Sequence, residues 1–356
     1  MENKGLLFIP DISGFTRFIN ETEINHSRLI IQELLELLIN ANKIGLEVSE
    51  IEGDAILFYK FGELPKLNEL YSQVEKMFCD FHKQLKAYQY RRFCQCKACT
   101  LAVNLSLKVI THYGEFTGYN VRNFQKLIGR DVIIAHQLLK NNIEQHEYWL
   151  ITNNLLQTDS PPGFAQWMQW NNSAKLTDSG EVNFLYTQLS PLKENIEPEP
   201  IPNLDLSRKE KMISLTREYD ASIIPLFHAS GDFSYRSQWQ QGIKEIEEIS
   251  HFLPRVGMRC RFVLENGESF VYASSYLFSA DRIEFSETAE ENEHTRYYTL
   301  EKINDTKTRL TIDHFIPGNS FAQFLFNLKK KKKMEEELQQ SMIRLESVVK
   351  DIRLPD

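Results

Sequence analysis

Two aspartates lie in segments whose residue types suit metal and phosphate chemistry. Asp11 lies in the segment Phe8–Thr16, where an apolar run ends and Gly14 follows, so that neighbouring backbone amides can approach an anion closely. Asp54 follows Gly53 in a turn between two β-rich halves, within residues 46–59. Carboxylate oxygens are the ligands that Mg²⁺ or Mn²⁺ prefers. The pair predicts a divalent-metal site if the fold brings the two turns together.

A cluster of cysteines could bind a different metal. Cys94, Cys96 and Cys99 form a Cys-x-Cys-x-x-Cys pattern, and Cys79 and His82 precede them on a predicted helix. Four thiolates, or three with a histidine, suit a tetrahedral zinc ion. The alternative is a set of buried thiols at a helix–strand junction. The odd total of 5 cysteines argues against a disulfide framework.

Hydrophobic periodicity predicts the elements that must position these residues. Strands, helices and a hairpin are expected in the order βαββαβ, which is typical of a ferredoxin-like α+β sandwich. Such a sheet places the hairpin beside the first strand, and Asp54 would then lie near Asp11. The predicted elements are a strand at 5–9, helices at 26–44 and 66–88, the hairpin at 46–59, a strand at 101–113, a helix at 131–140 and a strand at 149–152.

Four motifs in order resemble the class III adenylate/guanylate cyclase domain over residues 1–190. They are Phe8–Thr16, the Gly53-Asp54 hairpin, Leu107–Glu115 and Gly129–Leu138. The resemblance implies that Asp11 and Asp54 bind the metal and that Glu50 reads the purine. The partner purine-reading position, usually Asp or Cys in the family, falls on Lys126, which is a departure from the pattern. A carboxylate at position 50 would favour guanine, whose ring N–H and amino groups are donors. It also implies a homodimer, because homodimeric cyclases form their sites between two copies.

Other positions depart from the cyclase pattern. The transition-state Asn of the family falls on Ile133, its transition-state Arg on Gln137, and its triphosphate-binding Lys near Ser179. Loss of positive charge at the transferred phosphate would slow phosphoryl transfer by orders of magnitude, unless Lys126, Arg130 or His136 substitutes. Three hypotheses follow. The domain is catalytically degenerate and binds a nucleotide or a partner, or it is a divergent metal-dependent purine nucleotide cyclase, or it is an interaction scaffold without a ligand.

A proline-rich and acidic linker, residues 191–211, separates this domain from a second one at 212–356. The second domain resembles the START-like superfamily (SRPBCC, including polyketide cyclase), which implies a curved antiparallel sheet gripping a long C-terminal helix, here predicted at 321–352. Such folds bind lipids or other apolar small molecules. Period-two alternation places four aromatic residues on one strand face, where they would line that cavity or simply fill a core: Phe270, Tyr272, Tyr276 and Phe278.

Composition narrows the class of protein. The chain has 356 residues and a formal net charge of −8, so it has no overall basic field for nonspecific nucleic-acid binding. No secretory signal precedes Pro10, and no uncharged apolar run reaches the roughly 18 to 20 residues that span a bilayer. We therefore expect a cytoplasmic signalling or sensing protein with two α+β domains.

Overall fold

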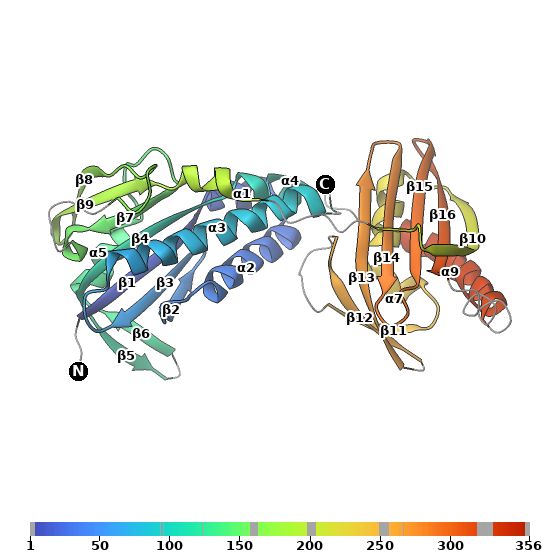
Figure 1. Cartoon of the computed structure of the whole chain (residues 1–356), viewed down its shortest axis with the longest axis horizontal. Helices are drawn as coiled ribbons and strands as arrows, with labels where there is room; N and C mark the ends of the chain where they lie inside the picture. The colour runs from blue at the N-terminus through green and yellow to red at the C-terminus, as the bar shows by residue number, and fades with distance from the viewer. Residues whose placement is uncertain are drawn as a thin grey trace. The chain divides into compact units, whose positions relative to one another are not determined.

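The computed structural model divides into two compact units, residues 1–87 with 100–199 and residues 88–99 with 200–356, and each is described by itself (Figure 1). The structure describes residues 4–92, 94, 96–122, 124–156, 163–197, 204–248, 256–265, 267–318 and 330–352. Among the helices in these ranges, none combines the length and the apolar character needed to cross a membrane.

The first unit is built on one seven-stranded sheet with the order β2-β3-β1-β4-β7-β9-β8. Its elements are β1 (Lys4–Ser13), α1 (Phe15–Glu21), α2 (Ile24–Asn40), β2 (Glu47–Glu52), β3 (Ala55–Phe61), α3 (Leu67–Arg91), β4 (Ser106–Glu115), α5 (Arg130–Leu138), β7 (Tyr148–Thr152), β8 (Asn171–Thr177) and β9 (Gly180–Gln188). Strands β2, β3, β1 and β4 have the antiparallel neighbours and the order of a ferredoxin-like sandwich. The predicted α+β class and βαββαβ order are confirmed.

Both faces of this sheet are covered, which explains why β1 reads as a continuous apolar run. Phe8 on β1 packs edge to face against Phe58 on β3, while Leu7 and Ile9 join the opposite core cluster. That cluster includes Val132 and other apolar residues of α5. Helices α2 and α3 lie together along the sheet (Figure 1). Side chains on successive positions of β1 therefore enter different cores.

Several elements differ from the prediction. The strand expected at 101–113 begins only at Ser106, because α4 (Lys97–Leu101) and a 3-10 turn (Ala102–Asn104) precede it. A separate two-stranded ribbon, β5 (Thr117–Val121) and β6 (Phe124–Ile128), extends between β4 and α5. The expected linker begins within the first unit, where a 3-10 helix (Ser190–Asn195) buries Leu192 and the backbone oxygen of Ile196 accepts a hydrogen bond from Lys86.

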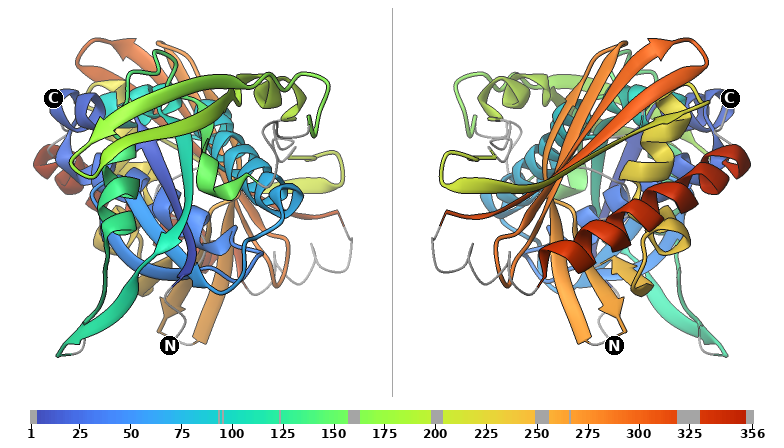
Figure 2. Two further views of the ribbon diagram at one scale, coloured as in Figure 1. Left: turned by 90° about the vertical axis from the view of Figure 1, so that its left-hand side faces the viewer. Right: turned by 90° about the vertical axis from the view of Figure 1, so that its right-hand side faces the viewer.

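The second unit is a seven-stranded antiparallel sheet with the order β10-β16-β15-β14-β13-β12-β11. A long helix, α9, crosses one face of this sheet (Figure 2). It buries Leu338, Met342 and Leu345 in the core, and its Met342 backbone oxygen accepts a hydrogen bond from the Tyr219 hydroxyl at 2.7 Å. The elements are β10 (Lys209–Tyr219), α6 (Ile223–Gly231), α7 (Arg236–Trp239), β11 (Ile243–Glu248), β12 (Arg259–Leu264), β13 (Gly267–Phe278), β14 (Arg282–Ala289), β15 (Thr295–Asn304), β16 (Lys307–Pro317) and α9 (Lys331–Asp351). Residues 321–329 of the expected terminal helix lie outside the described residues.

The four aromatic residues expected to share one face of β13 do not do so. A register shift between Ala273 and Ser275 adds one residue to the strand, and this reverses the alternation beyond it. The guanidinium of Arg259 lies over the ring of Phe270, 4.8 Å from the ring centroid. The next residue, Val271, lies in the core. Tyr272, like Phe270, precedes the shift.

Beyond the shift, Tyr276 packs against the core and stacks on Phe227, whereas Phe278 is 42% exposed. None of the four predicted aromatics lines the pocket of about 230 Å³ in this unit. Its apolar lining residues are Phe262, Leu264, Val271, Ala289 and Met334.

Candidate functional site: an acidic pocket beside β1

The central strands of the first unit bring the two predicted metal aspartates together. Asp11 on β1 pairs in register with Ala55 on β3 and with Lys108 on β4. Asp54 lies at the turn just before β3, where its backbone oxygen accepts a hydrogen bond from the Ile12 amide at 2.9 Å. Gly53 has φ 62°, a conformation that favours glycine, so the tight turn fixes Asp54 beside the end of β1.

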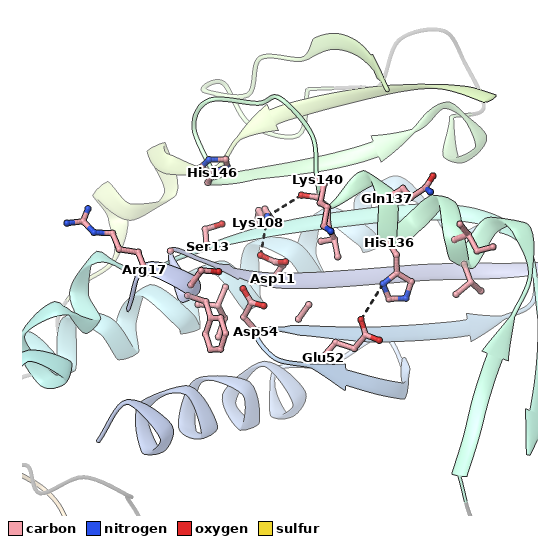
Figure 3. A pocket seen from close by; sticks show the side chains of 18 residues that line it. Asp11, Ser13, Arg17, Glu52, Asp54, Lys108, His136, Gln137, Lys140 and His146 are labelled. Carbon is pink, nitrogen blue, oxygen red and sulfur yellow. Dashed lines mark hydrogen bonds and ion pairs between the residues drawn. The ribbon is translucent and has the colours of Figure 1, made fainter. Parts of the chain in front are cut away.

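Both carboxylates line one pocket of about 850 Å³ (Figure 3). The pocket is bounded by the end of β1, the β2–β3 turn and α5, and its rim carries basic and polar side chains. Besides Asp11 and Asp54, the polar and charged residues described around the pocket are Ser13, Thr16, Arg17, Glu52, Lys108, His136, Gln137, Lys140 and His146. This volume and mixed lining are typical of a small-molecule site.

A lysine already neutralises the inner aspartate. The Lys108 ammonium lies 3.2 Å from Asp11 Oδ1, and both side chains are close to fully buried. Burial raises the pKa of Asp11, while the nearby Lys108 opposes this rise. Lys108 also donates to the Leu139 backbone oxygen at 3.4 Å. A cation of the chain itself therefore already balances Asp11 at the position where a metal would bind.

The pKa of Asp54 lies well above the usual range of an aspartate. Burial and the neighbouring charge of Asp11 raise the pKa of Asp54 to about 6, because both disfavour its ionised form. A divalent cation would relieve both effects by pairing with the carboxylates. The two aspartates and Lys108 form a charge cluster whose acidic members fit the hard-oxygen preference of Mg²⁺ or Mn²⁺.

The pKa of Asp54 predicts a pH-dependent stability. Between pH 4 and 6 the folded chain binds more protons at Asp54 than the unfolded chain, so the free energy of unfolding falls as pH rises through this window. The Asp54→Asn variant has no group that titrates at this position, so this loss should be absent. Relative to the unsubstituted protein, its free energy of unfolding should therefore be about 1–2 kcal/mol higher at pH 7 than at pH 4, after allowance for solvent screening of the half-buried group. Urea denaturation at both pH values measures it. Asp281→Asn, at an exposed site, is the control and should not alter the change in the free energy of unfolding between pH 4 and pH 7. The same result for Asp54→Asn would contradict the prediction.

The two residues predicted to read a purine bind each other. The Lys126 ammonium donates to Glu50 Oε2, and His136 Nε2 lies 3.6 Å from Glu50 Oε1. Glu50 is on β2 and Lys126 on β6, and neither lines the acidic pocket. Glu50 would have to release Lys126 before it could bind a base edge.

The positions that depart from the cyclase pattern lie at the pocket or beside it. Ile133 and Gln137 on α5 both line the pocket. The Gln137 amide exchanges two hydrogen bonds with Asp178, on the turn between β8 and β9. Arg130 donates to the Ser179 backbone oxygen on the same turn. Arg130 is not among the described residues that line the pocket.

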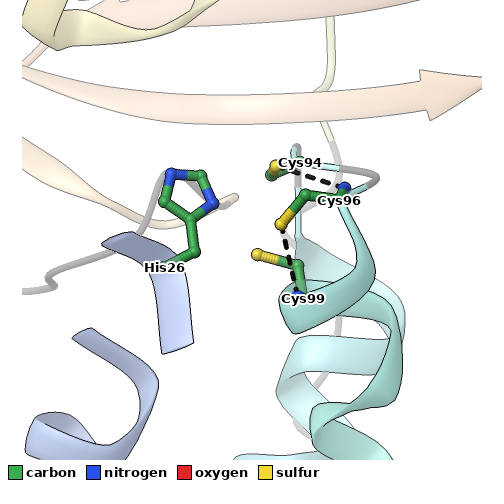
Figure 4. A group of neighbouring side chains, drawn as sticks. All are labelled: His26, Cys94, Cys96 and Cys99. Carbon is green, nitrogen blue, oxygen red and sulfur yellow. Dashed lines mark hydrogen bonds between the residues drawn. The ribbon is translucent and has the colours of Figure 1, made fainter. Parts of the chain in front are cut away.

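The structure brings three of the four predicted cysteines together. Ligand atoms of Cys94, Cys96 and Cys99 all lie within 4.8 Å of one another (Figure 4). Cys79, predicted as a ligand, is not in this group. It lies on α3, which continues for 12 residues beyond it, so about 18 Å of rigid helix separate it from the helix end.

Sequence reasoning did not single out Lys108. Lys108 was visible as a lone charged residue in a strand whose neighbours, Leu107 and Val109, are apolar and fully buried. An unexplained charge inside a buried strand requires a partner, and the strand register supplies Asp11.

A protein-family model matches about a third of the chain. The model of DUF2652, a protein of unknown function, matches residues 31–148. The uncharacterised protein Rv2561/Rv2562 of Mycobacterium tuberculosis is 32% identical over 133 residues, which are 35% of this chain and 58% of that protein. The match thus spans little more than half of that relative.

Solved structures similar to this chain include nucleotide cyclase domains. The catalytic core of a rhodopsin–guanylyl cyclase with converted specificity, in complex with ATPαS, is 16% identical with a TM-score of 0.38, covering 52% of this chain and 96% of that one. A bacterial light-regulated adenylyl cyclase is 16% identical with a TM-score of 0.38, covering 55% and 57%. A guanylyl cyclase domain from the fungus Blastocladiella emersonii is 15% identical with a TM-score of 0.36, covering 52% and 96%.

Proposed function

We propose that the first unit binds a purine nucleoside triphosphate together with a divalent cation, Mg²⁺ or Mn²⁺, in the acidic pocket. The observation that carries this proposal is the convergence of Asp11 and Asp54 on one pocket of about 850 Å³. Asp11 and Asp54 would hold the cation, which would neutralise phosphate charge when bound. Arg17, Lys140 and His146 line the same pocket and would meet the outer phosphates.

We propose further that this pocket binds the nucleotide without cyclising it. Cyclisation is phosphoryl transfer, and its rate depends on fixed positive charge and donors around the transferred phosphate. Ile133 offers neither, and the uncharged Gln137 already bonds with Asp178. Lys108 is tied to Asp11. The proposed role is therefore nucleotide sensing within a signalling protein.

Calorimetric titration of the full chain with GTP and with ATP in the presence of Mn²⁺ tests both parts of this proposal. We expect binding of at least one nucleotide, an affinity at least about tenfold lower in Asp54→Asn because one metal ligand is lost, and no cyclic product by chromatography. Asp281→Asn, an exposed aspartate of the second unit, is the matched control and should bind as the unsubstituted protein does. Absence of binding by any nucleotide would reject the proposal and favour an interaction scaffold.

A second candidate function is a divergent metal-dependent guanylate or adenylate cyclase. It is favoured by the retention of both metal aspartates in one pocket. Such an enzyme would act as a homodimer, so light scattering should give twice the chain mass. Cyclic nucleotide that disappears in Asp54→Ala would establish this alternative and overturn the proposal of a silent pocket.

For the second unit we propose binding of a small ligand with an apolar body and a polar end, in keeping with a START-like arrangement. The pocket of about 230 Å³ supports this, because it joins Phe262, Leu264 and Met334 to the polar residues Arg296 and His314. Mass spectrometry of the protein under native conditions would detect a co-purified lipid or other small molecule. A lipid with a long acyl chain would contradict the small size of the pocket.

A further inference from the structure

The pocket of about 230 Å³ in the second unit combines apolar and charged lining residues. Phe262 and Leu264 of β12 and Met334 of α9 supply apolar surface, while Arg296 of β15 and His314 of β16 line the same space. A pocket of this kind holds the apolar body of a ligand and orients it through a few polar groups. The charge of those polar groups therefore decides which polar end a ligand can carry.

A row of three polar side chains crosses the sheet at this pocket. Arg296 pairs in register with Glu287 on β14 and with His314 on β16, so the three side chains lie on one face of the sheet. All three line the pocket. The carboxylate of Glu287 lies beside two arginines, Arg236 and Arg296. Two guanidinium groups beside one carboxylate leave one positive charge in excess.

Glu287 is bound to Arg236 more closely than to Arg296. Its Oε2 accepts a hydrogen bond from Arg236 at 2.7 Å, and its Oε1 accepts one from the Tyr298 hydroxyl at 2.7 Å. By contrast, Arg296 Nη1 lies 3.7 Å from Glu287 Oε1, which is too long for a hydrogen bond. The Arg296 side chain is only 24% exposed, so water screens its charge incompletely. The excess positive charge is therefore carried by Arg296, which lines the pocket.

Two histidines near Arg296 add hydrogen-bond donors to the pocket without adding charge. The rings of His294 and His314 meet edge to face, with their centroids 5.2 Å apart, and both residues line the pocket. Burial, and after it the charge of neighbouring cations such as Arg296, lowers the pKa of His294 to about 4 and that of His314 to about 3. Each imidazole is thus neutral at pH 7 and carries one N–H. These surroundings favour an anion.

We propose that this pocket binds a small monocarboxylic acid, with its carboxylate against Arg296 and its apolar body among Phe262, Leu264 and Met334. This assignment rests on the small-ligand function proposed for the second unit and adds the chemical class of the ligand. A guanidinium binds a carboxylate through two parallel hydrogen bonds. One negative charge balances the single charge in excess, whereas a phosphate monoester carries nearly two and would leave negative charge uncompensated in a largely buried site.

Calorimetric titration of the full chain with octanoate and phenylacetate, each compared with its alcohol, octanol or phenylethanol, is the first test. Each acid is close in size to its alcohol and differs mainly in charge. We expect at least one acid to bind at least about tenfold more tightly than its alcohol, because only the acid can pair with Arg296. Equal affinities would overturn the carboxylate and leave the small-ligand function standing. Tighter binding of octyl phosphate than of octanoate would also overturn it. Absence of binding by all of these compounds would reject both the function and the ligand class.

Arg296→Met tests where the carboxylate binds. Methionine removes the guanidinium, while the hydrogen-bonded pair of Glu287 and Arg236 remains. The affinity for the acid should fall at least about tenfold, to that of the alcohol, whereas the affinity for the alcohol should change less than about threefold. Arg296→Lys should keep part of the preference for the acid, because it retains the charge without the two parallel donors.

Arg282→Met is the matched control for this substitution. Arg282 is an arginine of β14 whose side chain is half exposed and pairs with Glu284, and it does not line the pocket. This variant should bind acid and alcohol as the unsubstituted protein does. Unchanged affinity for the acid in Arg296→Met, or equal losses in Arg296→Met and Arg282→Met, would refute the site.

Discussion

Glu287→Ala should lower the free energy of unfolding of the second unit by about 3–5 kcal/mol, because it leaves the buried Arg236 without a counterion. Arg236 on α7 is fully buried and donates to Glu287 on β14 at 2.7 Å and to the Tyr298 hydroxyl at 2.8 Å. The Tyr298 hydroxyl in turn donates to Glu287 at 2.7 Å. Burial opposes the charge on Arg236, but Glu287 and Tyr298 more than offset this and raise its pKa.

Guanidinium denaturation followed by circular dichroism measures this loss, with Glu290→Ala as the control. Glu290 also accepts two hydrogen bonds from one arginine, Arg259, but this pair lies at the surface. Loss of the Glu290 carboxylate should therefore lower the free energy of unfolding by less than about 1 kcal/mol. The double variant Arg236→Met with Glu287→Leu should recover most of the stability, since both buried charges are removed together. Equal costs for Glu287→Ala and Glu290→Ala would show that Arg236 finds solvent or another partner.

The fold could be predicted where periodicity and turn residues agreed. The hairpin at Gly53 follows from a glycine that adopts positive φ between two β-rich halves, and β2 and β3 form on either side of it. The long apolar stripe from Met334 to Ile352 indicated a helix, and α9 buries that stripe. These signals are local, so a single sequence reveals them.

The remaining features depend on which side chains meet across the fold. The register shift at Ala273 cannot be read from the alternation of β13, because the extra residue is defined only against β14. Glu50 and Lys126 were assigned separate roles toward a purine, yet their strands bring them into contact with each other. The acidic pair was predictable as a pair, since the strand order alone places Asp54 beside Asp11. The pairing of Asp11 with the Lys108 ammonium was not predicted.

Lys108→Met should raise the affinity of the nucleotide-free protein for Mn²⁺ by about tenfold or more, equivalent to at least about 1.4 kcal/mol. The reason is competition, because the ammonium 3.2 Å from Asp11 must leave the carboxylate before a metal can bind it closely. Methionine keeps the apolar length of the side chain within the strand, while it removes the charge and the long hydrogen bond to the Leu139 backbone oxygen. Calorimetric titration with MnCl₂ at pH 7.5, where Asp54 is ionised, measures the change.

Lys140→Met separates this competition from a general change in the charge of the pocket. Lys140 lines the same pocket but is exposed, so its loss should change Mn²⁺ affinity by less than about threefold. If Lys108→Met instead weakens Mn²⁺ binding, the lysine is needed to keep Asp11 ionised in its buried position rather than to exclude the metal. If the two lysine variants behave alike, only the net charge of the pocket matters. A selective gain in Lys108→Met would mean that the chain has kept the metal ligands of a cyclase-like pocket while occupying one of them with its own cation, which lowers metal affinity without removing either aspartate.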